Sequence, residues 1–246
     1  LRLQQMVIEN TRFVEMGYRK EGGFVGEHDR MTGDPIPEHI SAKWQDIELL
    51  IDGLLQSFQK METSNFDAVL AAAKIAFGFV FIHPFADGNG RTGRILLLLY
   101  LKLERLLDIP AIYLSQYIIE NKGAYYKCLR NVTEKQDWEA YILYMLDMVE
   151  QTAKKGIKTL EQIVNLMEEM GASIKASYPK IYSKDLIEAI FRLPYTKRKH
   201  LIEQGMGTPK TVSKYLKILE NAGHLKSVKV GKEKLYLNFK LMSILE

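Results

Sequence analysis

The chain has 246 residues, of which 47% are hydrophobic and 26% are charged. This composition is typical of a globular protein with a sizeable core and excludes a largely disordered chain. The single cysteine, Cys128, excludes an internal disulfide and a cysteine metal cluster and suits a reducing compartment. No signal peptide or membrane span is visible, so we expect a cytoplasmic protein without a membrane partner.

The net charge of +4 is unevenly distributed along the chain. Residues 178–246 carry 14 Lys/Arg and 6 Asp/Glu, a net of +8, so the remaining residues carry a net of −4. A basic C-terminal segment indicates a surface that can meet a polyanion.

The first 82 residues predict a helix, a hairpin and two further helices. Apolar spacing predicts a helix in residues 1–15, and Gly22-Gly23 ends it. A hairpin is predicted at about residues 22–37, because strand-like segments flank a polar turn. Ser41 is expected to cap the next helix and Asn65 the one that runs to Ile82.

Residues 83–94 lie between two apolar runs and read His-Pro-Phe-Ala-Asp-Gly-Asn-Gly-Arg-Thr-Gly-Arg. Proline and glycine are unfavourable inside helices, so we expect a loop over residues 83–90 and a new helix near Arg91. Backbone N–H groups at a helix N-terminus bind anions, and Arg91 and Arg94 share one helical face. This stretch therefore predicts a phosphate-binding loop.

Three side chains of the loop suit phosphate chemistry. Asp87 can hold Mg²⁺ together with phosphate oxygens, and Asn89 can donate to a phosphoryl oxygen. His83 titrates near neutral pH and can take a proton from an attacking hydroxyl. The alternative is a helix-capping turn with two surface arginines.

The stretch resembles the Fic family signature, His-x-Phe-x-[Asp/Glu]-Gly-Asn-Gly-Arg-x-x-Arg. All eight fixed positions match: His83, Phe85, Asp87, Gly88, Asn89, Gly90, Arg91 and Arg94. The resemblance covers roughly residues 5–150. It implies an enzyme that transfers AMP from ATP to a Tyr, Thr or Ser hydroxyl of a target protein, with His83 as general base and Asp87 holding Mg²⁺. It also implies that residues 87–94, including Thr92 and Gly93, bind the nucleotide.

Two further features follow from the resemblance. The hairpin corresponds to the family's flap, which pins the target protein by strand addition, and its Val25, Gly26 and His28 would lie near the nucleotide. The adjacent Tyr125 and Tyr126 would lie against the adenine. Without the resemblance, the hairpin is a plain connection and the tyrosines are half-buried aromatics.

The C-terminal residues predict a second domain. A connecting helix at residues 156–177 leads to residues 178–246, where helices and a basic hairpin resemble a winged helix-turn-helix. Its second helix is predicted at residues 196–203, and its third begins at Thr208 and Pro209. Four lysines are candidates for DNA contact: Lys210, Lys214, Lys217 and Lys232. A protein-docking or regulatory role is an equal alternative.

The sequence therefore predicts a mostly α protein, with a helical Fic core in residues 1–155 and a winged-helix domain. Many Fic proteins carry an inhibitory [Ser/Thr]-x-x-x-Glu-[Gly/Asn] motif; Glu9-Asn10 lacks the hydroxyl because Gln5 precedes it, so we expect any such motif upstream of Leu1. Two other functions stay open: transfer of another phosphate-bearing group, and a nucleotide-sensing DNA-binding regulator. A homodimer is also open.

Overall fold

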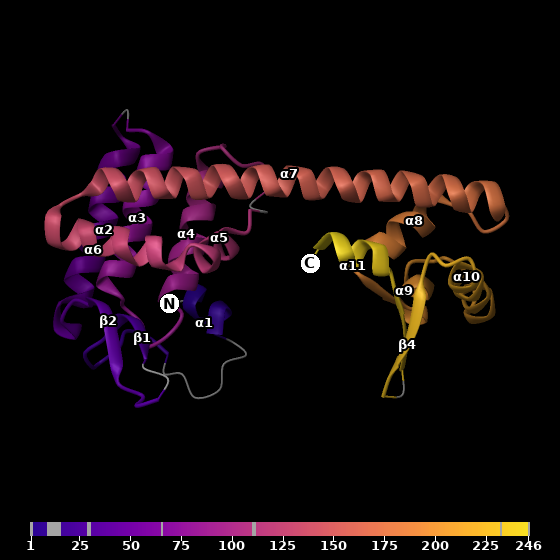
Figure 1. Cartoon of the computed structure of the whole chain (residues 1–246), viewed down its shortest axis with the longest axis horizontal. Coiled ribbons are helices and arrows are strands. Elements are labelled where there is room, and N and C mark those ends of the chain that lie inside the picture. The colour runs from indigo at the N-terminus through magenta and orange to yellow at the C-terminus, as the bar shows by residue number, and fades with distance from the viewer. Residues whose placement is uncertain are drawn as a thin grey trace. The chain divides into compact units, whose positions relative to one another are not determined.

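A computed structural model describes residues 2–8, 16–28, 31–64, 66–109, 112–231 and 233–245 (Figure 1). The chain divides into two compact units, Leu1–Lys154 and Lys155–Glu246. Helices dominate both units and each contains one small antiparallel sheet, which confirms the predicted mostly α fold. Within the described residues, no helix combines the length and the apolar character that a membrane crossing requires.

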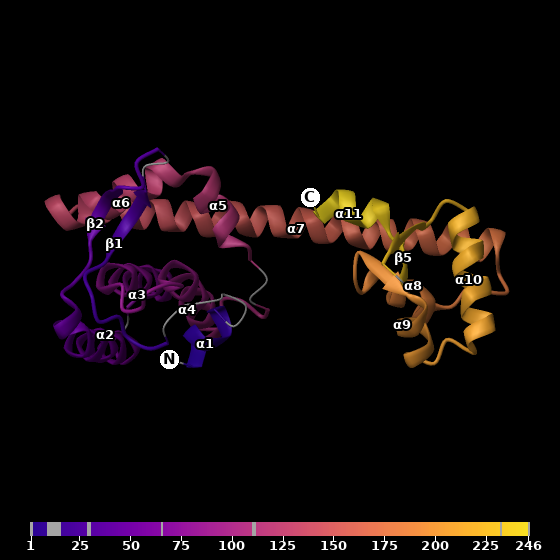
Figure 2. The same cartoon turned by 90° about the horizontal axis from the view of Figure 1, so that it is seen from below.

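The first unit is a helical bundle with one hairpin. Its elements are α1 (Arg2–Ile8), β1 (Phe24–His28), β2 (Pro35–Ile40), the 3₁₀ turn η1 (Trp44–Asp46), α2 (Ile47–Glu62), α3 (Ala68–Ile82), α4 (Asn89–Leu103), α5 (Leu114–Glu120), α6 (Lys122–Lys135) and the beginning of α7 (Trp138–Ser177). The central pair is α3 and α4, which lie side by side in both views (Figures 1 and 2).

Small residues allow α3 and α4 to approach closely. Ala72 and Ala76 are buried on α3, and a Cβ added at Gly93 of α4 would already lie 3.4 Å from Val80 Cγ2. Nine residues of α3 are buried, so this helix runs through the core of the first unit. The loop between the two helices is therefore held at both ends by the best-packed part of the unit.

The helix starts differ from the predicted caps. The Ser41 backbone N–H donates to Gly23 O at 3.0 Å and closes the base of the hairpin, and α2 starts later, after η1. Asn65 lies outside the described residues. Asp67 caps α3 instead, because its Oδ1 accepts the N–H groups of Val69 and Leu70 at 2.9 and 3.0 Å.

The hairpin is present, and β2 extends to Ile40, three residues beyond the predicted end. Its strands pair antiparallel, with an irregularity between Val25 and Gly26. The predicted connecting helix at residues 156–177 is the second half of α7, one continuous helix of 40 residues. No proline interrupts it, and the Lys154–Glu150 pair bridges one turn just before residue 156.

The second unit contains the rest of α7, α8 (Lys184–Phe191), β3 (Tyr195–Lys197), α9 (Arg198–Glu203), α10 (Pro209–Asn221), β4 (Lys226–Val230), β5 (Glu233–Leu237) and α11 (Phe239–Leu245). The sheet order is β3-β5-β4, all antiparallel. Thr208 caps α10 as predicted. Residues 196–197 were predicted as helix but belong to β3, because Thr196 pairs with Tyr236. A strand of three residues is too short to show the alternation of apolar and polar residues that predicts a strand.

Candidate active site

The loop between α3 and α4 has two residues in left-handed backbone conformations. His83, which ends α3, has φ 52°, and Gly88, which precedes α4, has φ 88°. The helix α4 begins at Asn89, two residues before the predicted start at Arg91. The loop is therefore shorter than the sequence indicates. A Cβ at Gly88 would lie 3.2 Å from Ile8 Cγ2, so glycine is needed there for both conformation and space.

Asn89 closes the loop through its own amide. Asn89 Oδ1 accepts the Phe85 N–H at 2.9 Å, and Asn89 Nδ2 donates to Phe85 O at 2.7 Å. The side chain is only 2% exposed. Asn89 therefore shapes the loop from inside it, and donation from its amide to a phosphoryl oxygen stays a prediction.

Thr92 and Gly93 do not face the loop. Thr92 is 3% exposed, and Gly93 faces Ala76, Phe79 and Val80 of α3. Consecutive helical residues are 100° apart, so these two lie on the buried side of α4 while Arg91 and Arg94 do not. Thr92 and Gly93 are therefore part of the packed side of α4, and their contact with the nucleotide stays a prediction.

Asp87 and Arg91 form an exposed ion pair at the mouth of the loop. Arg91 Nη2 lies 2.9 Å from Asp87 Oδ2, and the two side chains are 44% and 48% exposed. Asp87 Oδ1 also accepts the Gly88 N–H, and Arg91 Nη1 donates to Val7 O of α1 at 3.2 Å. Exposed pairs of this kind contribute little to stability, so both groups are free to exchange partners.

Arg94 is more buried than Arg91, and its side chain contacts α5. Its Nε donates to Ser115 Oγ of α5 at 2.8 Å. Burial lowers the pKa of Arg94, whereas Tyr125, Tyr113 and Tyr126 nearby favour its charged form. The arginine is therefore anchored through Nε, which leaves its two terminal nitrogens directed away from Ser115.

The two adjacent tyrosines are in different environments. Tyr125 belongs to the core, where burial raises its pKa to about 12. Tyr126 is half-buried, and Lys122 Nζ lies 5.8 Å from its ring centre. Neighbouring positions of a helix cannot both face one base, so at most Tyr126 presents an accessible ring. The contact of Tyr125 and Tyr126 with the adenine stays a prediction, and Tyr126 has the more accessible ring.

His83 is neutral at physiological pH. Burial, followed by the nearby Arg19 and His39, lowers its pKa to about 4, and Asp87 only partly opposes this shift. Its Nδ1 is buried and has no hydrogen-bond partner among the described residues. A neutral imidazole can accept a proton, and the burial of Nδ1 leaves Nε2 for that task.

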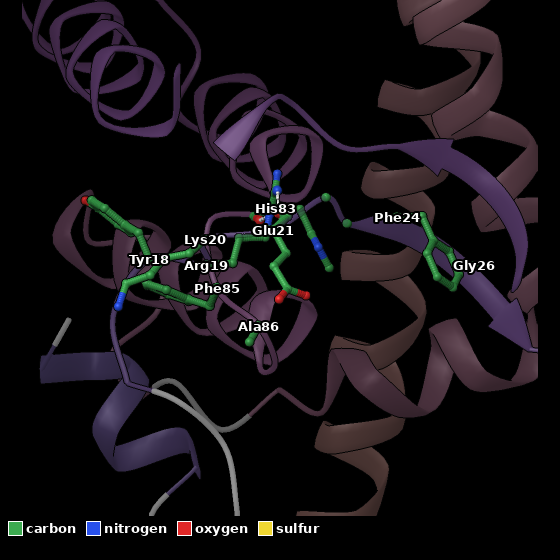
Figure 3. Close-up of a pocket in the computed structure, with 11 residues that line it drawn as sticks. Tyr18, Arg19, Lys20, Glu21, Phe24, Gly26, His83, Phe85 and Ala86 are labelled. Carbon is green, nitrogen blue, oxygen red and sulfur yellow. Dashed lines mark hydrogen bonds between the residues drawn. The ribbon is translucent and has the colours of Figure 1, made fainter. Parts of the chain in front are cut away.

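A pocket of about 710 Å³ opens beside His83. It is lined by residues 18–24, Gly26, His83, Phe85 and Ala86, with Tyr18 at one end and Phe24 and Gly26 of β1 at the other (Figure 3). Of the predicted flap residues, Gly26 faces this pocket, Val25 packs against the core, and His28 ends β1. The structure thus brings His83 and the hairpin to one cavity.

Arg19 is a site residue that the sequence did not reveal. It is 7% exposed, and its guanidinium donates to the backbone carbonyls of Glu21, Ala42, Ile82 and His83. Its backbone N–H donates to Pro84 O at 2.9 Å. Such contacts leave no sequence pattern, because all its partners are backbone atoms.

The donor set fits a Mg²⁺ ion held mainly by substrate. Within the described ranges, no group of three or more His, Cys, Asp or Glu side chains could hold a metal ion. Asp87 is half-exposed beside the loop, and Mg²⁺ is commonly held by one carboxylate plus phosphate oxygens and water. Asp87 suits that arrangement.

In the second unit, three of the four predicted lysines lie on α10. Lys210, Lys214 and Lys217 are exposed, while Val212, Leu216 and Leu219 on the opposite face are fully buried. Lys232 lies outside the described residues. Neighbouring lysines are paired instead: Lys197 with Glu233, Lys199 with Glu203 and Lys234 with Glu220. Among the residues that the structure describes, no ion pair involves the three α10 lysines.

Comparison with known proteins identifies both units. Residues 1–101 match the Fic/DOC family, and residues 166–241 match the family described as protein adenylyltransferase SoFic-like, C-terminal domain. Over 162 residues the chain is 27% identical to protein adenylyltransferase fic-1 of Caenorhabditis elegans, which covers 65% of this chain and 28% of that protein. Over 80 residues it is 41% identical to a Fido domain-containing protein of Dictyostelium discoideum, covering 32% of this chain and 48% of that protein.

The chain thus spans about a quarter to a half of the length of these curated relatives. A crystal structure of a Fic family protein from Desulfovibrio desulfuricans G20 matches 95% of this chain and 66% of its own, with a TM-score of 0.52 and 19% identity. That likeness supports the fold. The chain therefore carries a Fic/DOC family domain followed by a SoFic-like C-terminal domain.

Proposed function

We propose that this chain is a protein adenylyltransferase that moves AMP from ATP to a hydroxyl of a target protein. The observation that carries the proposal is a neutral, half-buried His83 that faces a pocket beside a glycine-rich helix start. The relative fic-1 of Caenorhabditis elegans is named a protein adenylyltransferase, and the family that matches the C-terminal domain has the same description, which supports this activity here.

The reaction needs a base, an anion site and charge neutralisation. His83 Nε2 takes the proton of the target hydroxyl as its oxygen attacks the α-phosphorus of ATP. The bond from the α-phosphorus to the bridging oxygen breaks, and pyrophosphate leaves. The first N–H groups of α4 have no helical partners and point toward where phosphates would lie.

The arginines and Asp87 serve the outer phosphates in this scheme. Arg94 is held by Ser115, so its terminal nitrogens are positioned for a phosphate oxygen. Arg91 would exchange Val7 O for a phosphate oxygen, and this exchange costs little free energy because the side chain is exposed. Mg²⁺ held by Asp87 would neutralise negative charge on the phosphates.

The target protein would add a strand to the hairpin. Such strand addition presents the target's backbone to β1 or β2 and brings one of its hydroxyl side chains to His83 at the pocket. Tyr, Thr and Ser all carry a suitable hydroxyl. Transfer of a different phosphate-bearing group is the rival within this reaction class.

The test is transfer of label from ATP to proteins of a cell lysate, with the label on either the α- or the γ-phosphate. The proposal expects label on protein from α-labelled ATP only, and none with His83→Ala. Label from γ-labelled ATP would identify a kinase-like reaction, and no label from either would contradict the proposal. His200→Ala, in the second unit, is the matched control.

For the second unit we infer a nucleic-acid interface on α10. The supporting observation is that its three lysines are exposed on one helical face and form no ion pair with the residues that the structure describes. Unpaired cations on one helical face suit the phosphates of a duplex. A gel-shift titration of the full chain at two salt concentrations tests this, and no binding at low salt would leave protein docking as the role of α10.

A further inference from the structure

The C-terminal end of α3 is capped by side chains from outside the helix. The last carbonyls of a helix have no partners within it. Here Phe81 O lies 3.1 Å from His39 Nε2, Ile82 O accepts from Arg19 Nη2 at 3.3 Å, and His83 O accepts from Arg19 Nε at 2.7 Å. His39 belongs to β2, and Arg19 precedes β1. Three consecutive carbonyls are therefore bound by the hairpin and the segment leading into it.

Arg19 joins three separate parts of the chain at this point. Besides the α3 carbonyls, its guanidinium donates to Glu21 O, before β1, and to Ala42 O, after β2. Arg19 forms no ion pair within the described part of the chain, although it is 7% exposed. The carbonyl end of a helix is its negative end, so the α3 dipole partly compensates the buried charge. Figure 3 shows Arg19 beside His83 at the pocket.

His39 ties the hairpin to the same helix end. Its ring packs on Phe81 with 4.6 Å between ring centres, and it is half-buried. His39 is opposite Val25, next to the irregularity in the hairpin. A shift of β2 by one residue would turn this side chain to the other face of the strand. The contact therefore fixes the register of the hairpin relative to α3.

We propose that Arg19 and His39 are positioning residues for His83. Together they form a clamp, which fixes the left-handed backbone conformation of His83 and the position of the hairpin relative to the end of α3. The inference rests on the proposed function only in naming His83 as the base. His83, with φ 52°, has a backbone conformation that is unfavourable for a residue with a side chain. Hydrogen bonds to its carbonyl and to the two preceding carbonyls hold that conformation in place.

The charge of Arg19 adds a second effect. After burial, Arg19 makes the largest contribution to lowering the pKa of His83, His39 adds to it, and Asp87 opposes it. Lys20 and Glu21 also line the pocket. The clamp therefore affects both where the imidazole lies and how readily it takes a proton.

Variants separate these two effects. Arg19→Met removes the donors and the charge at similar length, whereas Arg19→Lys keeps the charge and loses the planar fork. His39→Phe keeps the ring packing and loses the donor, and His39→Gln restores a donor. Arg105→Met, at an exposed turn after α4, is the control for loss of an arginine.

The experiment measures kcat, KM for ATP, and the NMR titration of the His83 imidazole in the free protein. We expect Arg19→Met and Arg19→Lys to lower kcat by about 10²-fold, with KM for ATP changed by less than about threefold. The His83 midpoint should rise toward 6.5 in Arg19→Met and stay low in Arg19→Lys. His39→Phe should lose about tenfold in kcat and His39→Gln should recover most of it.

Wild-type kcat together with an unmoved His83 midpoint in Arg19→Met would overturn the proposal. If Arg19 variants do not fold, the His39 pair decides: equal kcat in His39→Phe and His39→Gln overturns it. The NMR titration needs no AMP transfer. A wild-type protein without transfer, whose His83 midpoint still rises in Arg19→Met, would contradict the proposed function and support the clamp.

Discussion

The loop after α3 and the lysine face of α10 use charge in opposite ways. Around the loop, charged and polar groups are largely buried and held by directed bonds: Asn89 by Phe85, Arg94 by Ser115, and Arg19 by four carbonyls. On α10, Lys210, Lys214 and Lys217 are exposed, with no described partner. Buried groups act singly and through geometry, whereas exposed charges act together and are screened by salt. Single substitutions should therefore have large effects at the loop and small ones on α10.

The largest effect is expected from His83→Ala. Loss of a general base typically lowers the rate by about 10²–10⁴-fold. Binding of ATP should survive, because the imidazole holds no phosphate in this scheme. A time course of AMP transfer measures the rate, and equilibrium binding measures the affinity for ATP. A variant with a wild-type transfer rate would remove His83 from the chemistry.

The next largest effect is expected from Asp87→Ala. Loss of the carboxylate removes the one protein ligand assigned to Mg²⁺ and should lower transfer by about 10²-fold or more. The free energy of unfolding should change little, because the Arg91–Asp87 pair is exposed. Activity is measured against Mg²⁺ concentration. If Asp87→Ala responds to Mg²⁺ as the parent does, the metal is held elsewhere.

Asn89→Ala tests the loop's internal support. It removes a donor and an acceptor from buried Phe85 backbone groups, which should cost roughly 1–3 kcal/mol of unfolding free energy. Urea denaturation measures this, with exposed Asn221→Ala on α10 as the control. An unchanged midpoint would mean that the amide does not brace the loop.

The smallest single effects belong to α10. If Lys214 and Lys217 each contact a phosphate, replacing both with Ala should flatten the log–log salt dependence of duplex binding by about two units. Transfer of AMP should be unaffected, because these residues lie in the other unit. An unchanged slope with unchanged affinity would exclude both lysines from the interface.

Much of the site could be predicted from the sequence because its residues are contiguous. Twelve adjacent residues contain the histidine, the carboxylate, the turn and both arginines, so one pattern suffices. The direction of each side chain could not be predicted in this way. Asn89 points into the loop, Thr92 is buried and Gly93 faces α3, because helix packing decides which face of α4 is buried.

The residues that hold the site in place were harder to predict from the sequence than the residues of the site itself. Arg19 is 64 residues from His83, and its partners are backbone carbonyls, which every residue has. In the second unit, β3 depends on pairing with β5, which lies about 40 residues away in the chain. The local sequence of residues 196–197 therefore predicted a helix instead of a strand. Long-range pairing of short segments leaves no periodic signal in the chain.

The pH dependence of kcat/KM tests the central claim most directly, because it reports the pKa of the essential base in the free enzyme. His83 must be neutral to accept a proton, and its lowered pKa of about 4 keeps it neutral well below the usual 6.5. We therefore expect kcat/KM to stay level as the pH falls through 6.5 and to decline only as it approaches 4. A decline with a midpoint at or above 6.5 would contradict a half-buried, neutral His83 as the base.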